Sequence, residues 1–468
     1  MQIIIVGGGG VGYELARNLS DKNQDVVVVE KNELKARRFR ESLDVMVIED
    51  NGANAAVLEQ ANIKSADMLI AVTHVDEVNI IACMLAKQYN VPITVCRIRN
   101  SGYAGESSVL TPHQLGIDIV INPERVAAME ISKMLHFPDA SDVEYFNHGK
   151  VMMLGVVVGA EAEITDVPIH KLPLNPDAII VGISDPEGKF IVPGGNDVIR
   201  PGNKIYLLGK SRTLKNISSL LHHEKKRISQ VTILGGGMIG YQLALLLEES
   251  HQPFTVKLIE KDPERCEHLC KQLNRTLVLQ GDATEIAMLR EEDTDKADAI
   301  IAATGDDRNN IVAALLSRQF GVKKIICEVM KPQYVPVYSA LGIDSVINPR
   351  LLAAAQILRL IRREDVVALS ILQDEKAEVV EIILPESAKV AHKKIVQANF
   401  PRGMLIGSIV RDDSVIIPNG NTELLPNDHL VIFSIPKISG KIDRYFAPAN
   451  GKEGRENLRN KLSQIEES

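Results

Sequence analysis

The sequence predicts a duplicated α/β protein in which each copy has a doubly wound parallel sheet followed by a small α+β module. Three observations indicate this fold class. A glycine-rich turn follows the first apolar strand, a closely similar turn recurs near residue 235, and other segments also occur twice in the same order. Corresponding segments lie 225 to 231 residues apart, so the repeated unit is about half of the 468-residue chain.

The duplication extends well beyond the glycine turns. The matching segments are ADMLIAVTHVDEVN at 66–79 with ADAIIAATGDDRNN at 297–310, LGIDIVINPE at 115–124 with LGIDSVINPR at 341–350, and IVPGGNDVIRPGN at 191–203 with IIPNGNTELLPND at 416–428. Small changes in spacing are expected when short loop insertions or deletions separate two copies.

The first part of each copy alternates apolar strands with helical patterns. In the first copy we expect strands at Ile3–Val6, Asp25–Glu30, Met46–Glu49, Met68–Val72 and Thr94–Ile98. We expect helices at Gly10–Leu19, Leu34–Leu43, Ala53–Ala61 and Val78–Tyr89. This alternation predicts a parallel sheet covered by helices on both faces. Only 4% of the residues are aromatic, so aliphatic side chains must form the core, as in parallel sheets.

The later part of each copy lacks this alternation of strands and helices. Short alternating strands are separated by turns such as VPGGN and RPGNK, which predicts a small α+β module. We therefore expect doubly wound domains at 1–135 and 229–362, small modules at 142–225 and 367–447, and a charged tail at 448–468. Asn-Pro opens the segments Pro123–Leu135 and Pro349–Arg362 and predicts a helix start in each. Such a helix can be a simple connector, or it can carry motion or a dimer contact.

Composition excludes several functional classes. A net charge of −8 argues against binding nucleic-acid phosphates as the main function. Five scattered cysteines indicate reduced thiols in a cytosol. Cys266, His268 and Cys270 lie close together on a predicted helix but lack a fourth metal ligand, so we interpret them as packing residues.

No apolar run reaches the ~18 residues that span a bilayer, and the first strand begins almost at Met1. We expect a cytoplasmic protein that reaches a membrane only through a partner.

The first glycine turn fits the dinucleotide-binding fingerprint of Rossmann-like domains. Gly7 permits the tight turn after Ile3–Val6, Gly9 lets a pyrophosphate approach the backbone, and Gly12 lets the helix pack on the strand. The helix N-terminus then offers unpaired N–H groups to phosphates. The same spacing recurs at Gly235, Gly237 and Gly240. The alternative for each copy is a glycine-rich turn that binds no ligand.

A carboxylate ends the second strand of each copy. Glu30 follows Gly7 by 23 residues, and Glu260 follows Gly235 by 25 residues. A carboxylate at this place accepts hydrogen bonds from ribose hydroxyls and repels a 2′-phosphate. NAD(H) or an adenine nucleotide therefore fits the site better than NADP.

Further polar residues follow the other strands that end at the same crevice. After the third and fourth strands we expect contributions from Asn51, Asp282, Thr73, His74 and Thr304. Arg97 and Arg99 lie two apart on the fifth strand, so they share a face and can pair with phosphates or with a nearby carboxylate. Glu328 and Met330 take their places in the second copy. We hypothesise that the second site binds nucleotide more weakly or in another manner.

Catalysis is not expected. His74 is the only acid–base candidate near the first crevice, and its counterpart is Gly305. Two glycine turns that can bind a nucleotide, without a catalytic group, indicate two sensor sites. Their bound nucleotides would alter the arrangement of the domains. An NAD-dependent oxidoreductase with its catalytic group in the α+β module is one alternative. A nucleotide-sensing subunit of another transporter is the other.

The order GGGGVG, Glu30, VTHVDEVN, CRIR and a P-G-N turn, all repeated, resembles the RCK family, in which a KTN (TrkA-N) domain precedes a TrkA-C domain. The tandem arrangement is similar to that of TrkA-type subunits of Trk potassium uptake systems. The resemblance implies binding of NAD(H) and ATP or ADP, dimers and tetramers that form a ring of RCK units, and docking on a membrane-embedded TrkH or TrkG subunit to gate potassium flow.

The binding residues expected from the motifs and the resemblance fall into two sets. The first set is Gly7, Gly8, Gly9, Gly10, Val11, Gly12, Glu30, Asn51, Thr73, His74, Arg97 and Arg99. The second set is Gly235, Gly236, Gly237, Met238, Ile239, Gly240, Glu260, Asp282 and Thr304. The sequence departs from the family pattern in two places. EDNGA replaces the usual Gly-Asp after the third strand, which affects the contact expected at Asn51, and Glu328 replaces an arginine in the second copy.

Overall fold

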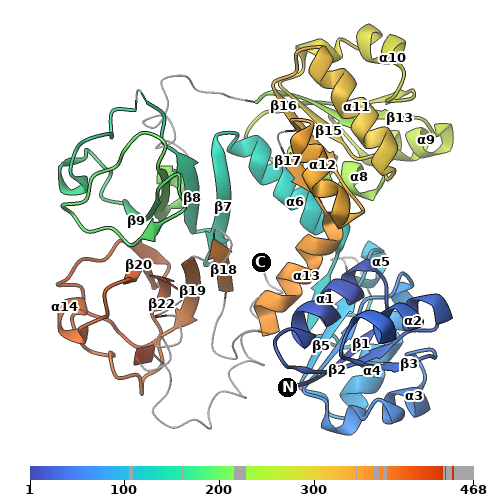
Figure 1. The fold of residues 1–468 in the computed structure, drawn as a ribbon, viewed down its shortest axis with the longest axis horizontal. Coiled ribbons are helices and arrows are strands. Elements are labelled where there is room, and N and C mark those ends of the chain that lie inside the picture. The colour runs from blue at the N-terminus through green and yellow to red at the C-terminus, as the bar shows by residue number, and fades with distance from the viewer. Residues whose placement is uncertain are drawn as a thin grey trace. The chain divides into compact units, whose positions relative to one another are not determined.

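The computed structural model describes residues 1–104, 109–160, 162–214, 228–343, 345–361, 368–372 and 377–435, with residues 438, 445 and 446. The chain divides into two compact units (Figure 1), Met1–His136 with Ile228–Leu358, and Phe137–Arg227 with Arg359–Ser468. Corresponding parts of the two copies therefore share a unit. The expected charged tail at 448–468 lies outside the described residues.

The first doubly wound sheet has six parallel strands in the order β3-β2-β1-β4-β5-β6. Its strands are β1 (Gln2–Val6), β2 (Asp25–Val29), β3 (Met46–Ile48), β4 (Met68–Ala71), β5 (Ile93–Arg97) and β6 (Ile119–Ile121). Its helices are α1 (Gly10–Ser20), α2 (Glu33–Ser42), α3 (Ala55–Gln60), α4 (Asp76–Gln88) and α5 (Ser101–Ala104). The predicted fold class is confirmed, and each predicted element lies within two residues of the observed one at both ends.

The second sheet repeats this topology in the order β14-β13-β12-β15-β16-β17. Its strands are β12 (Gln230–Leu234), β13 (Thr255–Glu260), β14 (Leu277–Gln280), β15 (Ala299–Ala302), β16 (Lys324–Glu328) and β17 (Ser345–Ile347). Its helices are α8 (Met238–Glu249), α9 (Pro263–Gln272), α10 (Ile286–Glu291), α11 (Asp307–Gln319) and α12 (Val335–Ala340). In this strand order the connections reverse direction beside the first strand, and the resulting crevice is where such sheets bind ligands.

Apolar runs explain why the central strands lie in the middle of each sheet. Ile3, Ile4 and Ile5 of β1 are fully buried because helices cover both faces of the strand. Short polar side chains start the flanking helices. The Asn32 side chain accepts the N–H of Lys35 before α2, and Asp262 accepts the N–H of Arg265 before α9.

A helix from the first copy packs on the second sheet. This helix, α6 (Pro123–His136), lies against α8 (Figure 1) and buries Ala127, Ile131 and Leu135 in the core of the second domain. At its end the ring of His136 meets Phe254 edge-on, with centroids 5.1 Å apart. The counterpart helix in the second copy is α13 (Pro349–Ile361). Helix α6 thus joins the two repeats of the chain through a contact that the sequence analysis did not expect, while its expected roles in motion or in a dimer contact stay predictions.

The other unit contains two five-stranded antiparallel sheets. The first has the order β10-β9-β11-β8-β7, with β7 (Ala140–Phe146), β8 (Val151–Val157), β9 (Ala178–Ser184), β10 (Phe190–Ile191) and β11 (Lys204–Lys210). The second has the order β18-β19-β22-β20-β21, with β18 (Ala368–Leu372), β19 (Ala377–Ile383), β20 (Met404–Arg411), β21 (Ser414–Ile416), β22 (His429–Ser434) and the short helix α14 (Ile395–Ala398).

The two modules share a core within their unit. The rings of Phe190 and Phe433 stack with centroids 5.6 Å apart, and the fully buried Tyr206 packs beside them. The N–H of Asn147 also donates to the buried carboxylate of Glu381 at 3.1 Å. None of the described helices combines the length and the apolarity needed to cross a bilayer.

Candidate nucleotide-binding cleft

A cleft of about 620 Å³ opens where β1, β2, β4 and β5 end. This volume is ordinary for a small-molecule site. Its basic lining residues are Lys31, Lys35, Arg38, Arg97, Arg99 and Arg350, and its acidic ones are Glu30, Asp50, Glu124 and Glu328. Of the expected first-site residues all except Gly12 line the cleft, and Ile239 of the second set lines it as well. Glu328, Met330, Pro349 and Arg350 also belong to the second copy, so both copies build the cleft.

The three fingerprint glycines of the first turn differ in what surrounds them. Gly7 has φ +110°, and a Cβ there would lie 2.8 Å from the backbone nitrogen of Thr73. A Cβ at Gly12 would lie 1.9 Å from the carbonyl oxygen of Gly7, whereas one at Gly9 would meet nothing within 4 Å. Gly7 and Gly12 are therefore required by the backbone, and Gly9 leaves open space where a ligand can approach.

The N-terminus of α1 faces this open space without a side-chain cap. Gly9 precedes the helix in an extended conformation, with φ −70° and ψ −172°, and has no side chain that can bond to the first N–H groups. Gly237 precedes α8 in the same manner, with φ −62° and ψ −171°. Uncapped N–H groups and the helix dipole make such a turn a site for an anion, and phosphate is the usual one.

Glu30 also braces the glycine turn. Its carboxylate accepts the N–H of Gly8 at 2.5 Å and the N–H of Asn32 at 2.8 Å. In the second copy Glu260 accepts from Gly236 at 2.7 Å and from Asp262 at 2.9 Å. A carboxylate has about four acceptor positions, so these bonds leave lone pairs for ribose hydroxyls. The sequence indicated the ribose role and missed the bracing role.

A buried asparagine ties the fourth strand to the fifth. The side chain of Asn79 accepts from the N–H and the hydroxyl of Thr73, at 2.9 and 2.7 Å, and donates to the carbonyl of Arg97 at 2.9 Å. Asn310 repeats these bonds with Thr304 and the carbonyl of Glu328. Sequence reasoning missed both asparagines, although their recurrence in the repeated VDEVN and DDRNN segments was a usable signal.

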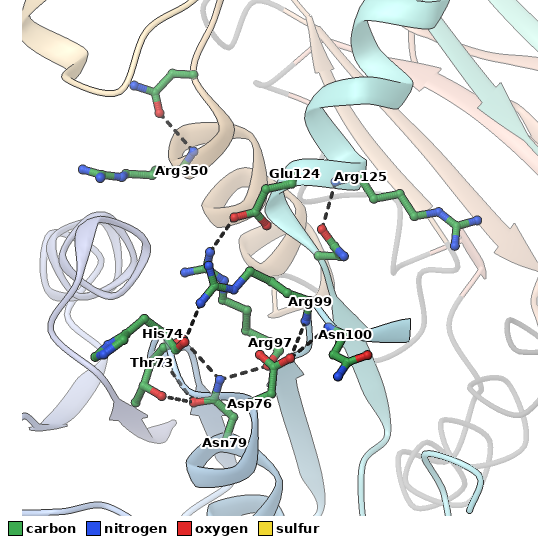
Figure 2. Close-up of polar contacts among 12 residues, drawn as sticks. Thr73, His74, Asp76, Asn79, Arg97, Arg99, Asn100, Glu124, Arg125 and Arg350 are labelled. Atoms are coloured by element: carbon green, nitrogen blue, oxygen red, sulfur yellow. Dashed lines mark hydrogen bonds and ion pairs between the residues drawn. The ribbon is translucent and has the colours of Figure 1, made fainter. Parts of the chain in front are cut away.

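Arg97 forms an ion pair, which is one of the two roles that the sequence left open. Its Nη2 lies 2.8 Å from Oε1 of Glu124, which reaches from the start of α6 toward the end of β5 (Figure 2). Burial lowers the pKa of the guanidinium, while Glu124 counteracts this effect. The Nε of Arg97 and the second oxygen of Glu124 are buried without a hydrogen-bond partner in the described structure. The pair therefore keeps unused bonding capacity at the wall of the cleft.

The neighbouring arginine, Arg99, lies in the loop after β5 and is held by the loop after β4 and the first residue of α4. Arg99 donates from its guanidinium to the carbonyl of His74, and Asp76 accepts the N–H groups of Arg99 and Asn100, both at 2.9 Å (Figure 2). The His74 side chain is exposed at the cleft, as is that of Asn51, which accepts the N–H of Ala53 at 3.1 Å. Asp76 was another residue that sequence reasoning missed.

The second copy differs at the positions that correspond to the two arginines. Glu328 is buried, and burial together with the charges of Asp307 and Glu124 raises its pKa to about 7. The N–H of Gly305 and the charge of Arg350 act in the opposite direction. Asp282 accepts from the N–H and the hydroxyl of Thr284, at 2.9 and 2.6 Å. The second turn thus has the same backbone as the first and a different charge beside it.

The paired doubly wound domains and their glycine turns define a two-copy protein of the Rossmann type. The TrkA-N domain family matches residues 3–123 and 231–349, and the TrkA-C domain family matches residues 153–222 and 379–447. Together these matches cover most of the chain. The chain belongs to the TrkA family, in which a TrkA-N domain precedes a TrkA-C domain.

Curated relatives match over almost the full length. A protein named Trk system potassium uptake protein TrkA homolog 1, from Methanosarcina mazei, is 34% identical, with 95% of this chain and 100% of the relative covered. A protein from Archaeoglobus fulgidus named Trk system potassium uptake protein TrkA homolog is 33% identical, with 95% of this chain and 100% of the relative covered. The TrkA of Azorhizobium caulinodans is 32% identical over 95% and 98%.

Solved structures of the RCK class share the fold. The GsuK channel bound to NAD superposes with a TM-score of 0.62 at 20% identity, covering 95% of this chain and 79% of that one. The crystal structure of the GsuK RCK domain gives a TM-score of 0.61, also at 20% identity, with 95% of each chain covered. The expected resemblance to the RCK family is confirmed. The names of the relatives are those of potassium uptake proteins, in line with a regulatory role and not an enzymatic one.

Proposed function

We propose that this chain is the nucleotide-sensing regulatory subunit of a Trk-type potassium uptake system. NAD(H), ATP or ADP binds in the cleft, and the bound nucleotide gates potassium flow through a membrane-embedded subunit of the TrkH or TrkG kind. The chain acts at the inner face of the cell membrane through that partner. The names of the relatives support the choice of potassium uptake, and the GsuK channel bound to NAD supports the choice of ligand.

The observation that carries the proposal is the geometry at Gly9. A Cβ placed there would meet nothing within 4 Å, and the uncapped N-terminus of α1 follows directly. Arg97, Arg99 and Lys35 line the same cleft and offer positive charge to phosphates. Glu30 stands at the end of β2 with acceptor positions for a ribose. Together these groups match the phosphate and sugar parts of an adenine nucleotide.

The shared construction of the cleft suggests how binding is transmitted. Residues of both copies line it, and α6 of the first copy packs on α8 of the second. A nucleotide that contacts both copies favours one arrangement of the two doubly wound domains over another. Only such a difference in binding free energy can shift the equilibrium between arrangements. The membrane subunit then responds to the arrangement that the nucleotide favours.

Assembly into a homo-oligomer, up to a ring of RCK units, belongs to the same proposal. Helix α4 exposes 44% of Ile81 and 44% of Met84, one turn apart. The corresponding face of α11 exposes 43% of Val312 and 39% of Leu315. Neighbouring exposed apolar side chains at the same two places in both copies support a contact surface, because clustered exposed apolar residues mark interaction sites.

Potassium uptake in cells tests the proposal. A strain that lacks its own regulatory subunit is given the membrane Trk subunit with this chain, without it, or with the variant Gly9→Val and Gly237→Val. At Gly9 the added Cβ meets nothing within 4 Å, at Gly237 it meets only the Ala303 carbonyl oxygen at 4.0 Å, and both residues have negative φ, so the turns stay folded. The proposal predicts uptake that depends on the chain and is lost in the variant. Uptake that does not depend on the chain, or steady NADH oxidation by the purified chain with a small substrate, would contradict it.

A further inference from the structure

We propose that Arg350, from the second copy, is a phosphate-binding residue of the first nucleotide site. The inference rests on the proposed function, because it assumes that a nucleotide occupies the first cleft. It assigns a ligand contact to a residue outside the fingerprint and outside both expected sets of site residues. The ligand class is an adenine nucleotide with two or more phosphates.

Arg350 lies directly against the first glycine turn. A Cβ built on Gly10 would come within 2.3 Å of its Cδ, 2.9 Å of its Nε and 3.0 Å of its Nη1. Figure 2 shows the side chain extending sideways from the start of α13, and these distances place it over the first residue of α1. The fingerprint needs glycine at positions 7, 9 and 12 and leaves position 10 free. The glycine at position 10 therefore makes room for the arginine.

The backbone of Arg350 is fixed, while its guanidinium makes no hydrogen bond to any residue that the structure describes. Asn348 is buried, and its side-chain oxygen accepts the N–H groups of Arg350 and Leu351, both at 3.0 Å. Among the described residues the guanidinium of Arg350 has no hydrogen bond and no ion pair. The buried Glu328 accepts the N–H of Gly305, and the charge of Arg350 lowers its pKa from a distance without a hydrogen bond or ion pair between the two in the described structure.

The position of this charge beside the turn favours an anion. A guanidinium beside the first residue of α1 lies at the positive end of a helix dipole, where cations are unfavourable. A phosphate bound at the turn removes this conflict, because it accepts from the N–H groups of α1 and from the arginine at once. Arginine also suits the task since its planar fork can donate two parallel bonds to phosphate oxygens.

The second site does not repeat this arrangement. Met238 takes the place of Gly10, and the residue that corresponds to Arg350 is Glu124, which pairs with Arg97. The inference therefore predicts that the contribution of this arginine to phosphate binding is a property of the first site alone. It gives a specific physical reason for the expected difference between the two sites.

Titration calorimetry of the full chain tests the inference. Gly237→Val is placed in every variant to block the second turn, so that only the first site is measured. Arg350→Ala is then titrated with ATP, ADP and adenosine. Arg125→Ala is the matched control, because Arg125 is an exposed arginine at the start of α6 and does not line the cleft. We expect Arg350→Ala to weaken ATP binding about tenfold or more and to leave adenosine binding unchanged, as for loss of one charge-assisted contact.

A second variant guards against a general effect on folding. Gly10→Ala keeps all charges but pushes the arginine away from the turn, and we expect a loss of several-fold in ATP affinity. Equal ATP affinities for Arg350→Ala, Gly10→Ala and the control would overturn the inference and leave the proposed function intact. An equal loss for ATP and adenosine would also overturn it. Absence of nucleotide binding in the parent chain itself would overturn the proposed function together with the inference.

Discussion

Nη2 of Arg97 lies 2.8 Å from Oε1 of Glu124, and the residues at the corresponding positions of the second copy, Glu328 and Arg350, carry the reverse charges. In each copy one of the two residues ends the fifth strand, and the other lies at the start of the helix that follows the sixth strand. The duplication therefore preserved charged residues at these positions while exchanging their signs. As a result the two nucleotide turns have nearly the same backbone and unlike surroundings.

Removal of the Glu124 charge should strengthen phosphate binding at the first site. In Glu124→Gln the Arg97 guanidinium is no longer neutralised and can turn its charge to the ligand, so we expect ATP affinity to rise several-fold. Without nucleotide the partly buried arginine is left unpaired, and stability should fall by about 1–2 kcal/mol. Calorimetry and urea unfolding measure the two effects. Weaker ATP binding in this variant would mean that Glu124 itself helps to hold the ligand.

Glu328 should make stability depend on pH. Its pKa is about 7 in the folded chain against an ordinary 4.5, because of burial and the charges of Asp307 and Glu124, opposed by Arg350. A raised carboxyl pKa contributes stability that is present below pH 4.5 and is lost as the pH rises through about 7. The loss is at most roughly 3 kcal/mol. Glu328→Gln stays neutral, so it should be more stable than the parent above pH 7.

Thermal unfolding between pH 4.5 and 8 measures this effect, a range set by the raised pKa. The control is Glu291→Gln, which removes the same charge from an exposed residue at the end of α10. If the melting temperatures of the parent and of Glu328→Gln changed with pH in the same way, the buried carboxyl would not titrate as described.

Two glycines of the first turn should respond in opposite ways to substitution. Gly12→Ala places a Cβ 1.9 Å from the carbonyl oxygen of Gly7, so α1 must move and stability should fall by about 2 kcal/mol. Gly9→Val fills open space, so the melting temperature should stay unchanged. Nucleotide binding at the first site should be lost. Thermal unfolding and titration of both variants separate the two roles. Destabilisation by Gly9→Val without loss of binding would reverse the assignment.

The exposed face of α4 should determine the oligomeric state. Ile81→Lys with Met84→Lys places two charges on the proposed contact, and we expect a smaller molar mass by light scattering. Leu34→Lys is the control, since Leu34 is 77% exposed on α2 and its neighbourhood does not recur as an apolar pair. An unchanged mass for the α4 variant would exclude this face as a contact between chains.

Local patterns were sufficient to predict both sheets and the need for glycine at Gly7 and Gly12, whereas the ligand contact at Gly9 stays a prediction. Strand and helix periodicities are short-range, and the glycine spacing follows from the turn itself. The bonds of Asn79 and Asp76 were missed because they join strand ends that meet only after the sheet has formed.

Contacts between the two copies were equally hidden in the sequence. Nothing in the pattern of α6 indicates that it packs on α8, which lies more than a hundred residues later in the chain. The proximity of Arg350 to Gly10 depends on the same arrangement. The repeat revealed that Glu124 and Arg350 correspond, but only the folded unit places one beside Arg97 and the other beside the first turn.

Potassium flux into proteoliposomes tests the central claim most directly. Vesicles hold the membrane Trk subunit with this chain, and flux is measured with ATP, ADP, NADH or no nucleotide. The account predicts fluxes that differ among these conditions for the parent chain and become equal for the variant Gly9→Val with Gly237→Val. Equal fluxes for the parent chain under all four conditions, with nucleotide binding demonstrated in the same sample, would contradict it.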